Sequence, residues 1–324
     1  MSNKTNDELK SSQNKPPKNS SIWRWILTVV AIGFFAYQFS RQDFKETFTL
    51  IRELPSGTIL LSILSMLGSR IFIGARWNAL LKINDPKPNF KEILKITFAG
   101  LFSTNVLPTS IGGDVVRLFM GIQASLEPAY VTSSLIMDRI IGFTGMFFFL
   151  PYGITIFLRS PENPFISHII MVVPMAIVFS DLFKKLWEWG KKFILRVANS
   201  FRLWWGHPIY LLESMGFTLL HMAFYFMTIW LCLHAMHADL SILKIGAIYS
   251  LSYIISLFPL SIGGLGIQEL AISYLFSSLG NVPSESAYAL ALLIRLAFII
   301  CSLPGIFFLP DLGKIKREKQ TQDG

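Results

Sequence analysis

Charged residues are scarce in this chain. Only 15% of its 324 residues are Asp, Glu, Lys or Arg, whereas about a quarter of a typical soluble domain is charged. Hydrophobic residues make up 52% of the chain, and its mean hydropathy is +0.51. This composition argues against a sizeable soluble domain and predicts an integral membrane protein.

Cysteine is nearly absent. The two cysteines, Cys232 and Cys301, lie in apolar runs, where a thiol behaves as a small hydrophobic group. We therefore expect neither a disulfide framework nor a metal site. The side chains of His234, His237 and Asp239 have a spacing that a metal could use, but they stand at the end of an apolar run without a clear fourth ligand. We assign them to the membrane interface.

Motifs for nucleotide use and catalysis are also missing. The sequence has no Gly-x-x-x-x-Gly-Lys-Ser/Thr loop, so ATP-driven pumping is not encoded in it. No Ser/His/Asp or Cys/His arrangement stands at a recognisable nucleophile elbow. We therefore expect no enzyme activity and no cofactor. The formal charge of +9 is gathered in particular loops, which indicates membrane topology rather than nucleic-acid binding.

Long apolar runs are present in number. A helix that crosses a bilayer needs about 20 mostly apolar residues, and the sequence offers such runs at about 22–40, 57–77, 130–157, 165–183, 208–235 and 285–310. Two further apolar regions, 92–124 and 242–281, are interrupted by Pro and Gly. The fold class predicted is an all-α polytopic membrane protein with about six full spans and two re-entrant helical hairpins.

The distribution of Lys and Arg predicts the topology. Basic residues gather in the polar tail 1–21, which we expect to be disordered, and in 76–95, 184–202 and the tail 313–324. The positive-inside rule places these segments on the cytoplasmic side of the membrane. We expect this membrane to be a bacterial-type inner membrane. The loops near 41–53, 158–164, 236–241 and 280–285 then face outward. This assignment requires each interrupted region to return to the side from which it enters.

The two interruptions share a motif. Pro108-Thr109-Ser110-Ile111-Gly112-Gly113 and Pro259-Leu260-Ser261-Ile262-Gly263-Gly264 match at five of six positions, 151 residues apart. A span with an Arg and a later Pro follows each motif: Arg139 with Pro151, and Arg295 with Pro304. We predict an inverted repeat with halves at about 57–157 and 208–310 and a linker at 184–206, the construction of many secondary transporters.

The motifs also predict a polar interior. Backbone groups freed by Pro108, Gly112, Gly113, Pro259, Gly263 and Gly264, the expected hairpin tips, must be satisfied by protein or by cavity water. The helices expected after Gly113 and Gly264 would direct their partially positive N-termini at this interior, where a phosphate or carboxylate is favoured.

Seven charged residues are predicted at membrane depth: Arg70, Asp114, Arg117, Asp138, Arg139, Glu269 and Arg295. Each costs about 2.5–3.5 kcal/mol at a helix centre, so such residues usually face a partner or a water-filled path. Asp114 occupies an apparent N-cap position and Glu269 a first turn, so helix capping is an alternative for both. Snorkelling is an alternative for Arg139. We interpret Arg76-Trp77 as an interfacial anchor.

Taken together, these residues resemble the lysylphosphatidylglycerol synthetase transmembrane-region family, whose members include flippase-like domain proteins and the membrane half of the multiple peptide resistance factor. The resemblance covers about 22–312. It is carried by Arg76-Trp77 with Leu80-Leu81, by Asn105 and Leu107-Pro108 to Gly112-Gly113-Asp114 with Arg117, by Asp138-Arg139 with Gly142, and by Pro259-x-Ser261-x-Gly263-Gly264-Leu265-Gly266 with Glu269. The chain departs from the family with Thr109 where Gly is frequent and Gln268 where Arg is frequent. The soluble aminoacyl-transferase domain is not in this sequence, so we expect only the flippase-like half to carry over.

The resemblance implies a flippase-like transporter for the head group of a phospholipid or polyprenyl-phosphate lipid. Arg117, Arg139, Arg295 and Arg70 would bind the phosphate, and Asp114, Glu269 and Asp138 would face a cationic group or a coupling proton. A membrane-embedded enzyme or an accessory subunit of lipid or lipid-linked glycan biosynthesis is an alternative, and so is a regulatory membrane protein without turnover. A homo-oligomer or a lipid-biosynthesis partner is compatible with each.

Overall fold

The computed structural model describes Gly33 and residues 44–83, 89–107, 112–159, 204–257 and 265–309. Within these ranges all regular structure is helical and no strand occurs, which confirms the all-α prediction for this part of the chain. The predicted span 22–40 apart from Gly33, the predicted span 165–183, the basic loop 184–202 and both tails lie outside the described residues.

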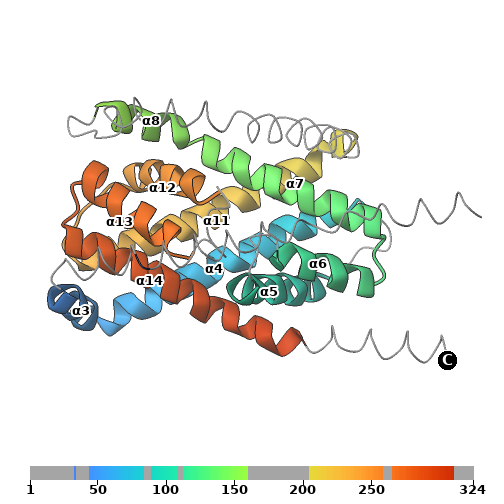
Figure 1. The fold of residues 1–324 in the computed structure, drawn as a ribbon. Helices are drawn as coiled ribbons and strands as arrows, with labels where there is room; N and C mark the ends of the chain where they lie inside the picture. Colours follow the sequence, from blue (N-terminus) through green and yellow to red (C-terminus); the bar gives the residue numbers. More distant parts are fainter. Residues whose placement is uncertain are drawn as a thin grey trace, which may run out of the picture.

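The helices form an elongated bundle (Figure 1). In chain order they are α3 (Phe44–Glu53), α4 (Ser56–Leu81), α5 (Phe90–Val106), α6 (Gly112–Gln123), α7 (Pro128–Phe147), α8 (Leu150–Arg159), α11 (Pro208–Ala235), α12 (Ile242–Leu257), α13 (Ile267–Gly280) and α14 (Ser284–Ser302), which continues into the 3-10 helix η2 (Leu303–Phe308).

Three of the predicted spans correspond to single helices of membrane-spanning length, and a fourth, 130–157, corresponds to a bent helix pair. Among the described residues, α4, α11, and α14 with η2 are long and apolar enough to cross a bilayer. Helices α7 and α8 meet the same criterion together but are bent by 46° at the break between them. Pro151 lies in the first turn of α8, and proline disrupts the hydrogen bonding of a continuous helix. The chain is therefore a multi-pass membrane protein.

Among the described helices, α4 and α11 make the most extensive contact. The ring of Phe224 packs over Gly68, where a Cβ would lie 2.7 Å from the ring. Ser65 Oγ donates a hydrogen bond to the Phe224 carbonyl oxygen at 2.7 Å, and Ser69 Oγ contacts His221 Nδ1 at 2.7 Å. Small and hydroxyl-bearing residues allow helices to approach closely in a bilayer, so this seam explains why the two long helices run together.

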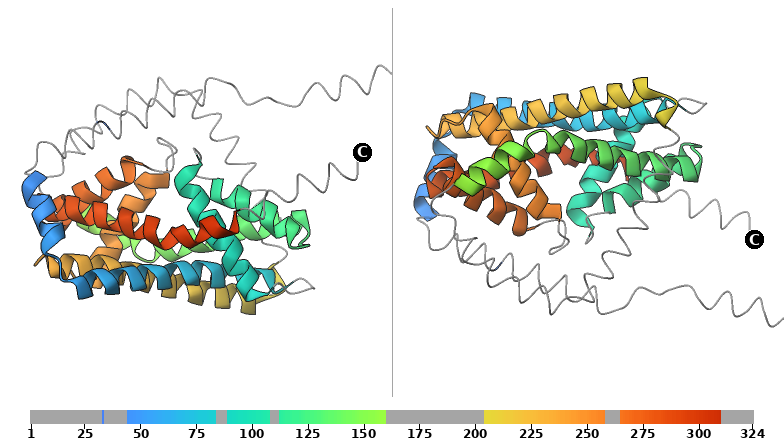
Figure 2. Two further views of the ribbon diagram at one scale, coloured as in Figure 1. Left: turned by 90° about the horizontal axis from the view of Figure 1, so that it is seen from below. Right: turned by 90° about the horizontal axis from the view of Figure 1, so that it is seen from above.

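The two interrupted regions form helix pairs, α5 with α6 and α12 with α13. The four helices have 17, 12, 16 and 14 residues, each shorter than the roughly 20 needed to cross a bilayer. The pairs lie toward opposite ends of the bundle (Figures 1 and 2). Their connections, with Pro108, Pro259, Gly263 and Gly264, lie outside the described residues, and membrane re-entry remains a prediction.

Each helix pair packs on the broken end of a long helix from the other half. Gly153 of α8 lies against the Ala247 carbonyl of α12, and Gly305 of η2 lies against the Phe98 carbonyl of α5. A Cβ at either glycine would collide with backbone. A glycine thus makes the same kind of close backbone contact in each of the two predicted halves.

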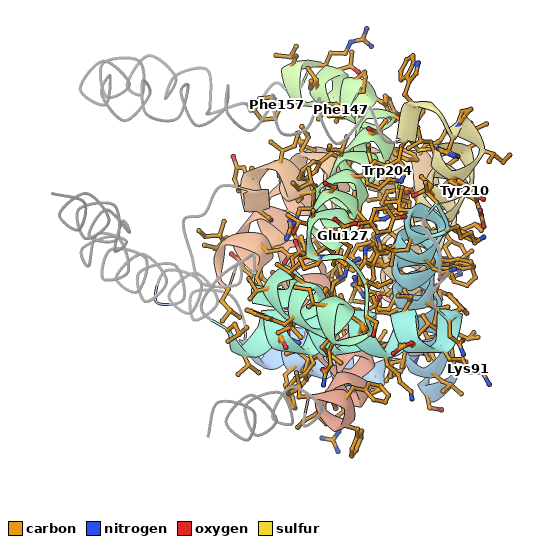
Figure 3. All side chains as sticks on the ribbon, turned by 90° about the vertical axis from the view of Figure 1, so that its right-hand side faces the viewer. Lys91, Glu127, Phe147, Phe157, Trp204 and Tyr210 are labelled. Carbon is orange, nitrogen blue, oxygen red and sulfur yellow. The ribbon has the colours of Figure 1, made fainter. Side chains whose placement is uncertain are left out.

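The predicted outward segments lie together at one end of the bundle. Helix α3, the end of α8, and the connections 236–241 and 281–283 are at the left in Figures 1 and 2. Figure 3 looks at the opposite end, where α5 and α11 begin with Lys91 and Tyr210 near their first turns. The segment 41–53, predicted as an outward loop, contains the short helix α3, and Ile51 and Leu54 pack into the hydrophobic core.

Gly113 offers a test of the α5 and α6 contact. A Cβ at Gly113 would lie 2.6 Å from the carbonyl oxygen of Gly100. We expect Gly113→Ala to reduce the free energy of unfolding by about 1–3 kcal/mol, the typical cost of overpacking, measured by thermal unfolding in detergent. Gly216→Ala is the control, because a Cβ there would meet no atom within 4 Å. Equal losses in both variants would contradict this explanation.

Candidate functional site

One cavity of about 330 Å³ lies inside the bundle, which is within the usual size range of ligand sites. Its lining contains all seven charged residues predicted at membrane depth: Arg70, Asp114, Arg117, Asp138, Arg139, Glu269 and Arg295. They come from α4, α6, α7, α13 and α14. Both interrupted regions thus contribute to this lining, with Asp114 from α6 and Glu269 from α13.

Asp138 on α7 lies at the centre of the larger ionic network. Its side chain is 2% exposed. Arg76 Nε donates to its Oδ1 at 2.6 Å, and Arg117 Nη1 donates to its Oδ2 at 3.1 Å. The carboxylate therefore holds two buried guanidinium groups from two different helices.

Asp114 on α6 extends the network. Its Oδ1 accepts from Arg117 Nη1 at 3.3 Å, and its Oδ2 accepts from Arg139 Nε at 2.5 Å. Although Asp138 and Arg139 are adjacent in sequence, they pair with different partners, as their directions on a helix require. Asp114 is not an N-cap as predicted, because α6 begins at Gly112 and places Asp114 within the first turn. Gly112 and Gly113 also lie in that turn.

Glu269 and Arg295 form a second ion pair. Arg295 Nε donates to Glu269 Oε1, while Glu269 Oε2 accepts from the Gly266 N–H at 2.8 Å. Glu269 thus accepts the backbone N–H that precedes α13 and binds Arg295 at the same time. Helix α13 begins later than the expected start after Gly264, because Gly266, with φ of 80°, lies before the first helical residue.

The acid and arginine pair occurs once in each half. Asp114 and Glu269 lie in the first turns of the second helices of the two pairs. Their partners, Arg139 and Arg295, lie 25 and 26 residues further along the chain, on α7 and α14. The two ion pairs therefore occupy corresponding positions after the two sequence motifs, and the inverted repeat itself remains a prediction.

Arg70 on α4 is held differently. It is 6% exposed, and its Nη2 donates to the sulfur of Met66 at 3.0 Å. Its guanidinium carbon lies 4.6 Å from the ring centroid of Phe298 and 5.5 Å from that of Tyr225. Within the described ranges no carboxylate forms an ion pair with Arg70. Aromatic rings stabilise this cation in place of an acid.

Several arginine N–H groups of the cavity have no hydrogen-bond acceptor in the described part of the chain: Arg70 Nε, Arg117 Nε and Nη2, and Arg295 Nη2. A buried donor without an acceptor costs about 1–3 kcal/mol, and more for a charged group. Guanidinium groups only donate, and they match the oxygens of phosphate and carboxylate groups. The cavity is therefore suited to an anion.

Arg76 and Trp77 are not the interfacial anchor that the sequence suggested. Trp77 is fully buried, its Nε1 donates to Ser134 Oγ at 3.0 Å, and the Arg117 guanidinium lies 4.3 Å from its ring. Arg76 lines the cavity and binds Asp138. Gly142 lies four residues after Asp138, on the same face of α7, and leaves room for the Arg76 guanidinium. The spacing of Asp138 and Gly142 is the feature of the sequence that could have indicated a buried Arg76.

Some cavity residues were not identified from the sequence. His221 and Tyr225 on α11 and Tyr249 and Tyr253 on α12 line it, with Gln268 beside Glu269. Tyrosines in apolar helices carry no distinctive pattern, so no signal marked them.

The motif of His234, His237 and Asp239 lies away from the cavity. His234 pairs with Asp239 at 2.8 Å, and both side chains are exposed. The structure shows no group of three His, Cys, Asp or Glu side chains placed to hold a metal among the residues it describes.

Comparison with known proteins gives two relatives. A UPF0104 membrane protein of Methanocaldococcus jannaschii is 23% identical over 304 residues, which cover 85% of this chain and 89% of the relative. A UPF0104 membrane protein of Pyrococcus horikoshii is 25% identical over 187 residues, 55% of each chain. The model of the lysylphosphatidylglycerol synthase TM region matches residues 22–305, and the chain therefore belongs to this family.

Proposed function

We propose that this protein is a lipid transporter of the flippase type, in which the anionic head group of a phospholipid or polyprenyl-phosphate lipid passes through the arginine-lined cavity. One observation carries this proposal: Arg70, Arg117 and Arg295, which each have an N–H group without an acceptor in the described residues, line one cavity within a membrane-spanning bundle. An anion that bound there would satisfy donors that the described protein groups leave free.

The arrangement of the helices supports movement through the membrane. The pairs α5–α6 and α12–α13 lie toward opposite ends of the bundle (Figure 2), and each supplies a carboxylate to the cavity. In the proposed inverted repeat the two pairs enter the bilayer from opposite faces, as discontinuous helices do in many secondary transporters. The positive-inside rule would place both termini in the cytoplasm.

The residues take separate roles in this proposal. Arg117, Arg139, Arg295 and Arg70 bind the phosphate. The carboxylates of Asp114, Asp138 and Glu269 hold these arginines in position, and they also offer sites for a cationic group or a coupling proton.

The outer surface suits a lipid whose tails remain in the bilayer. Large apolar side chains are exposed on the long helices, including Leu60, Leu61 and Leu64 of α4, Leu212, Leu219 and Leu220 of α11, and Leu296, Ile299 and Ile300 of α14. Such a surface is stable against hydrocarbon and unfavourable against water. Acyl chains would therefore stay outside while the head group uses the cavity.

Leaflet exchange in reconstituted liposomes tests this function. We expect the protein to accelerate the exchange of a fluorescent anionic lipid above the rate in protein-free vesicles. Arg117→Gln should slow the protein-dependent exchange about tenfold or more, because charged hydrogen bonds contribute about 1.5–3 kcal/mol each. Arg52→Gln is the matched control, since Arg52 is an exposed residue of α3.

The outcomes separate the alternatives. Exchange no faster than in empty vesicles for every anionic lipid would refute transport. A chemically altered lipid after incubation would instead favour a membrane-embedded enzyme of lipid biosynthesis. Binding of lipid without exchange would favour a regulatory role.

A further inference from the structure

The charges that line the cavity do not balance. Among the described residues the lining holds five arginines, Arg70, Arg76, Arg117, Arg139 and Arg295, against three carboxylates, Asp114, Asp138 and Glu269. With His221 counted as neutral, two positive charges remain. Gln268 beside Glu269 adds none. We infer that the cavity selects a doubly charged phosphate monoester, and this inference rests on the proposed function for the lipid that carries the phosphate.

The two excess charges can be located. Arg295 with Glu269 is neutral as a pair. The larger network joins Arg76, Arg117 and Arg139 through Asp114 and Asp138, which leaves one positive charge. Arg70, whose neighbours are aromatic rings and Met66, supplies the other.

N–H groups without an acceptor among the described residues occur both on Arg70 and on Arg117 of the larger network. Arg70 Nε has no acceptor in the described ranges, and neither have Arg117 Nε and Nη2. Arg70 is 6% and Arg117 7% exposed. An anion that touches both would receive charged hydrogen bonds from two helices, α4 and α6, which matches the several acceptor oxygens of a terminal phosphate.

The sequence between the two helices of each pair supplies no acid. The segments 108–111 and 258–264, which join the helices of each pair, contain no Asp or Glu. Uncompensated charge in a low-dielectric interior is unfavourable. A zwitterionic head group would leave both excess charges, and a phosphodiester would leave one. A phosphate monoester above its second pKa of about 6 would neutralise both.

A monoester dianion has two possible sources, a lipid head group and a soluble phosphate. The binding experiment separates them by thermal stabilisation of the purified full chain in uncharged detergent at pH 8. The probes are dihexanoyl phosphatidate, dihexanoyl phosphatidylglycerol, dihexanoyl phosphatidylcholine, glycerol phosphate and inorganic phosphate. Ligands that bind the folded state raise the midpoint temperature according to their affinity.

We expect dihexanoyl phosphatidate to bind at least about tenfold more tightly than dihexanoyl phosphatidylglycerol, the effect of one additional charged hydrogen-bonded contact. Phosphatidylcholine should give the smallest shift. Equal or tighter binding of phosphatidylglycerol or phosphatidylcholine would overturn the inference. Glycerol phosphate or inorganic phosphate binding as tightly as phosphatidate would support the charge assignment but exclude a lipid as its source.

Arg70→Gln changes the charge balance by one. We expect it to weaken phosphatidate binding about tenfold to a hundredfold while phosphatidylglycerol binding changes much less, so that the preference is lost. Arg70→Lys, which keeps the charge, should retain the preference, and Arg52→Gln serves as the surface control. Equal weakening of both lipids in Arg70→Gln would show that Arg70 acts only on the structure and would overturn the inference.

Leaflet exchange keeps the inference separate from the proposed function. Faster exchange of phosphatidate than of phosphatidylglycerol supports both. If the protein accelerates the exchange of phosphatidylglycerol or phosphatidylcholine but not that of phosphatidate, the proposed transport stands and the charge selection is refuted. If no lipid exchanges while phosphatidate still binds most tightly, transport is refuted and the charge selection of the cavity stands.

Discussion

Asp138→Asn is expected to lower the free energy of unfolding by about 3–5 kcal/mol, the range found when one partner of a buried ion pair is removed. The Asp138 carboxylate is 2% exposed and accepts hydrogen bonds from Arg76 and Arg117. An amide keeps the shape of the side chain but removes the charge between two buried guanidinium groups. Their mutual repulsion would then be offset only through Asp114, which contacts Arg117.

Thermal unfolding of the purified protein in detergent measures this loss. Asp239→Asn is the matched control, because Asp239 is 78% exposed and its pair with His234 lies at the end of α11; exposed ion pairs contribute about 0–1 kcal/mol. Asp138→Glu retains the charge and should recover most of the stability. A loss in Asp138→Asn no larger than in Asp239→Asn would show that the network does not hold α4, α6 and α7 together.

The members of the cavity could be predicted from sequence because charge in an apolar run is costly. Arg70, Asp114, Arg139, Glu269 and Arg295 each interrupt hydrophobic stretches, so each had to face a polar interior. Their pairing was not predictable in full, because it depends on how the helix pairs dock on α7 and α14. Only the contact of Asp114 with Arg117, three residues away on one helix, follows from local spacing.

Arg76 was assigned wrongly because its sequence position has two physical meanings. An Arg-Trp pair near the end of a span is typical of a membrane interface. Helix α4, however, continues to Leu81, and Tyr130 and Trp204 donate hydrogen bonds to the carbonyl oxygen of Leu80. These contacts bury the last turn, so Arg76 and Trp77 face protein instead of lipid head groups.

The bounds of the long helices were predicted well and those of the short elements less well. The apolar run 208–235 matches α11, and 57–77 lies within α4, since a span must have a minimum apolar length. Helix α3 and the late start of α13 depend on packing against α14 and on the backbone conformation of Gly266. Hydropathy alone does not report either feature.

Replacing Glu269 and Arg295 together by Gln is expected to separate transport from folding. The pair is neutral, so its joint removal leaves no unpaired charge in the bilayer. Gln at position 269 can also accept the Gly266 N–H and so keep this hydrogen bond at the start of α13. We therefore expect near-wild-type thermal stability but lipid exchange slowed about a hundredfold, because the charged donors of Arg295 are lost.

Arg295→Ala alone is a less selective test, since it leaves the Glu269 carboxylate buried without its arginine; we expect membrane insertion to persist and exchange to be lost. The matched control replaces His234 by Gln and Asp239 by Asn, an exposed pair away from the cavity. Wild-type exchange in the Glu269→Gln/Arg295→Gln variant would make Arg295 a structural residue.

The corresponding change at Asp114 and Arg139 should affect folding as well, because Asp114 also binds Arg117. A lower thermal stability of the Asp114 and Arg139 double variant would thus show that the two ion pairs have different roles. Asp114 supports the larger ionic network, whereas Arg295 has an N–H group left for the lipid.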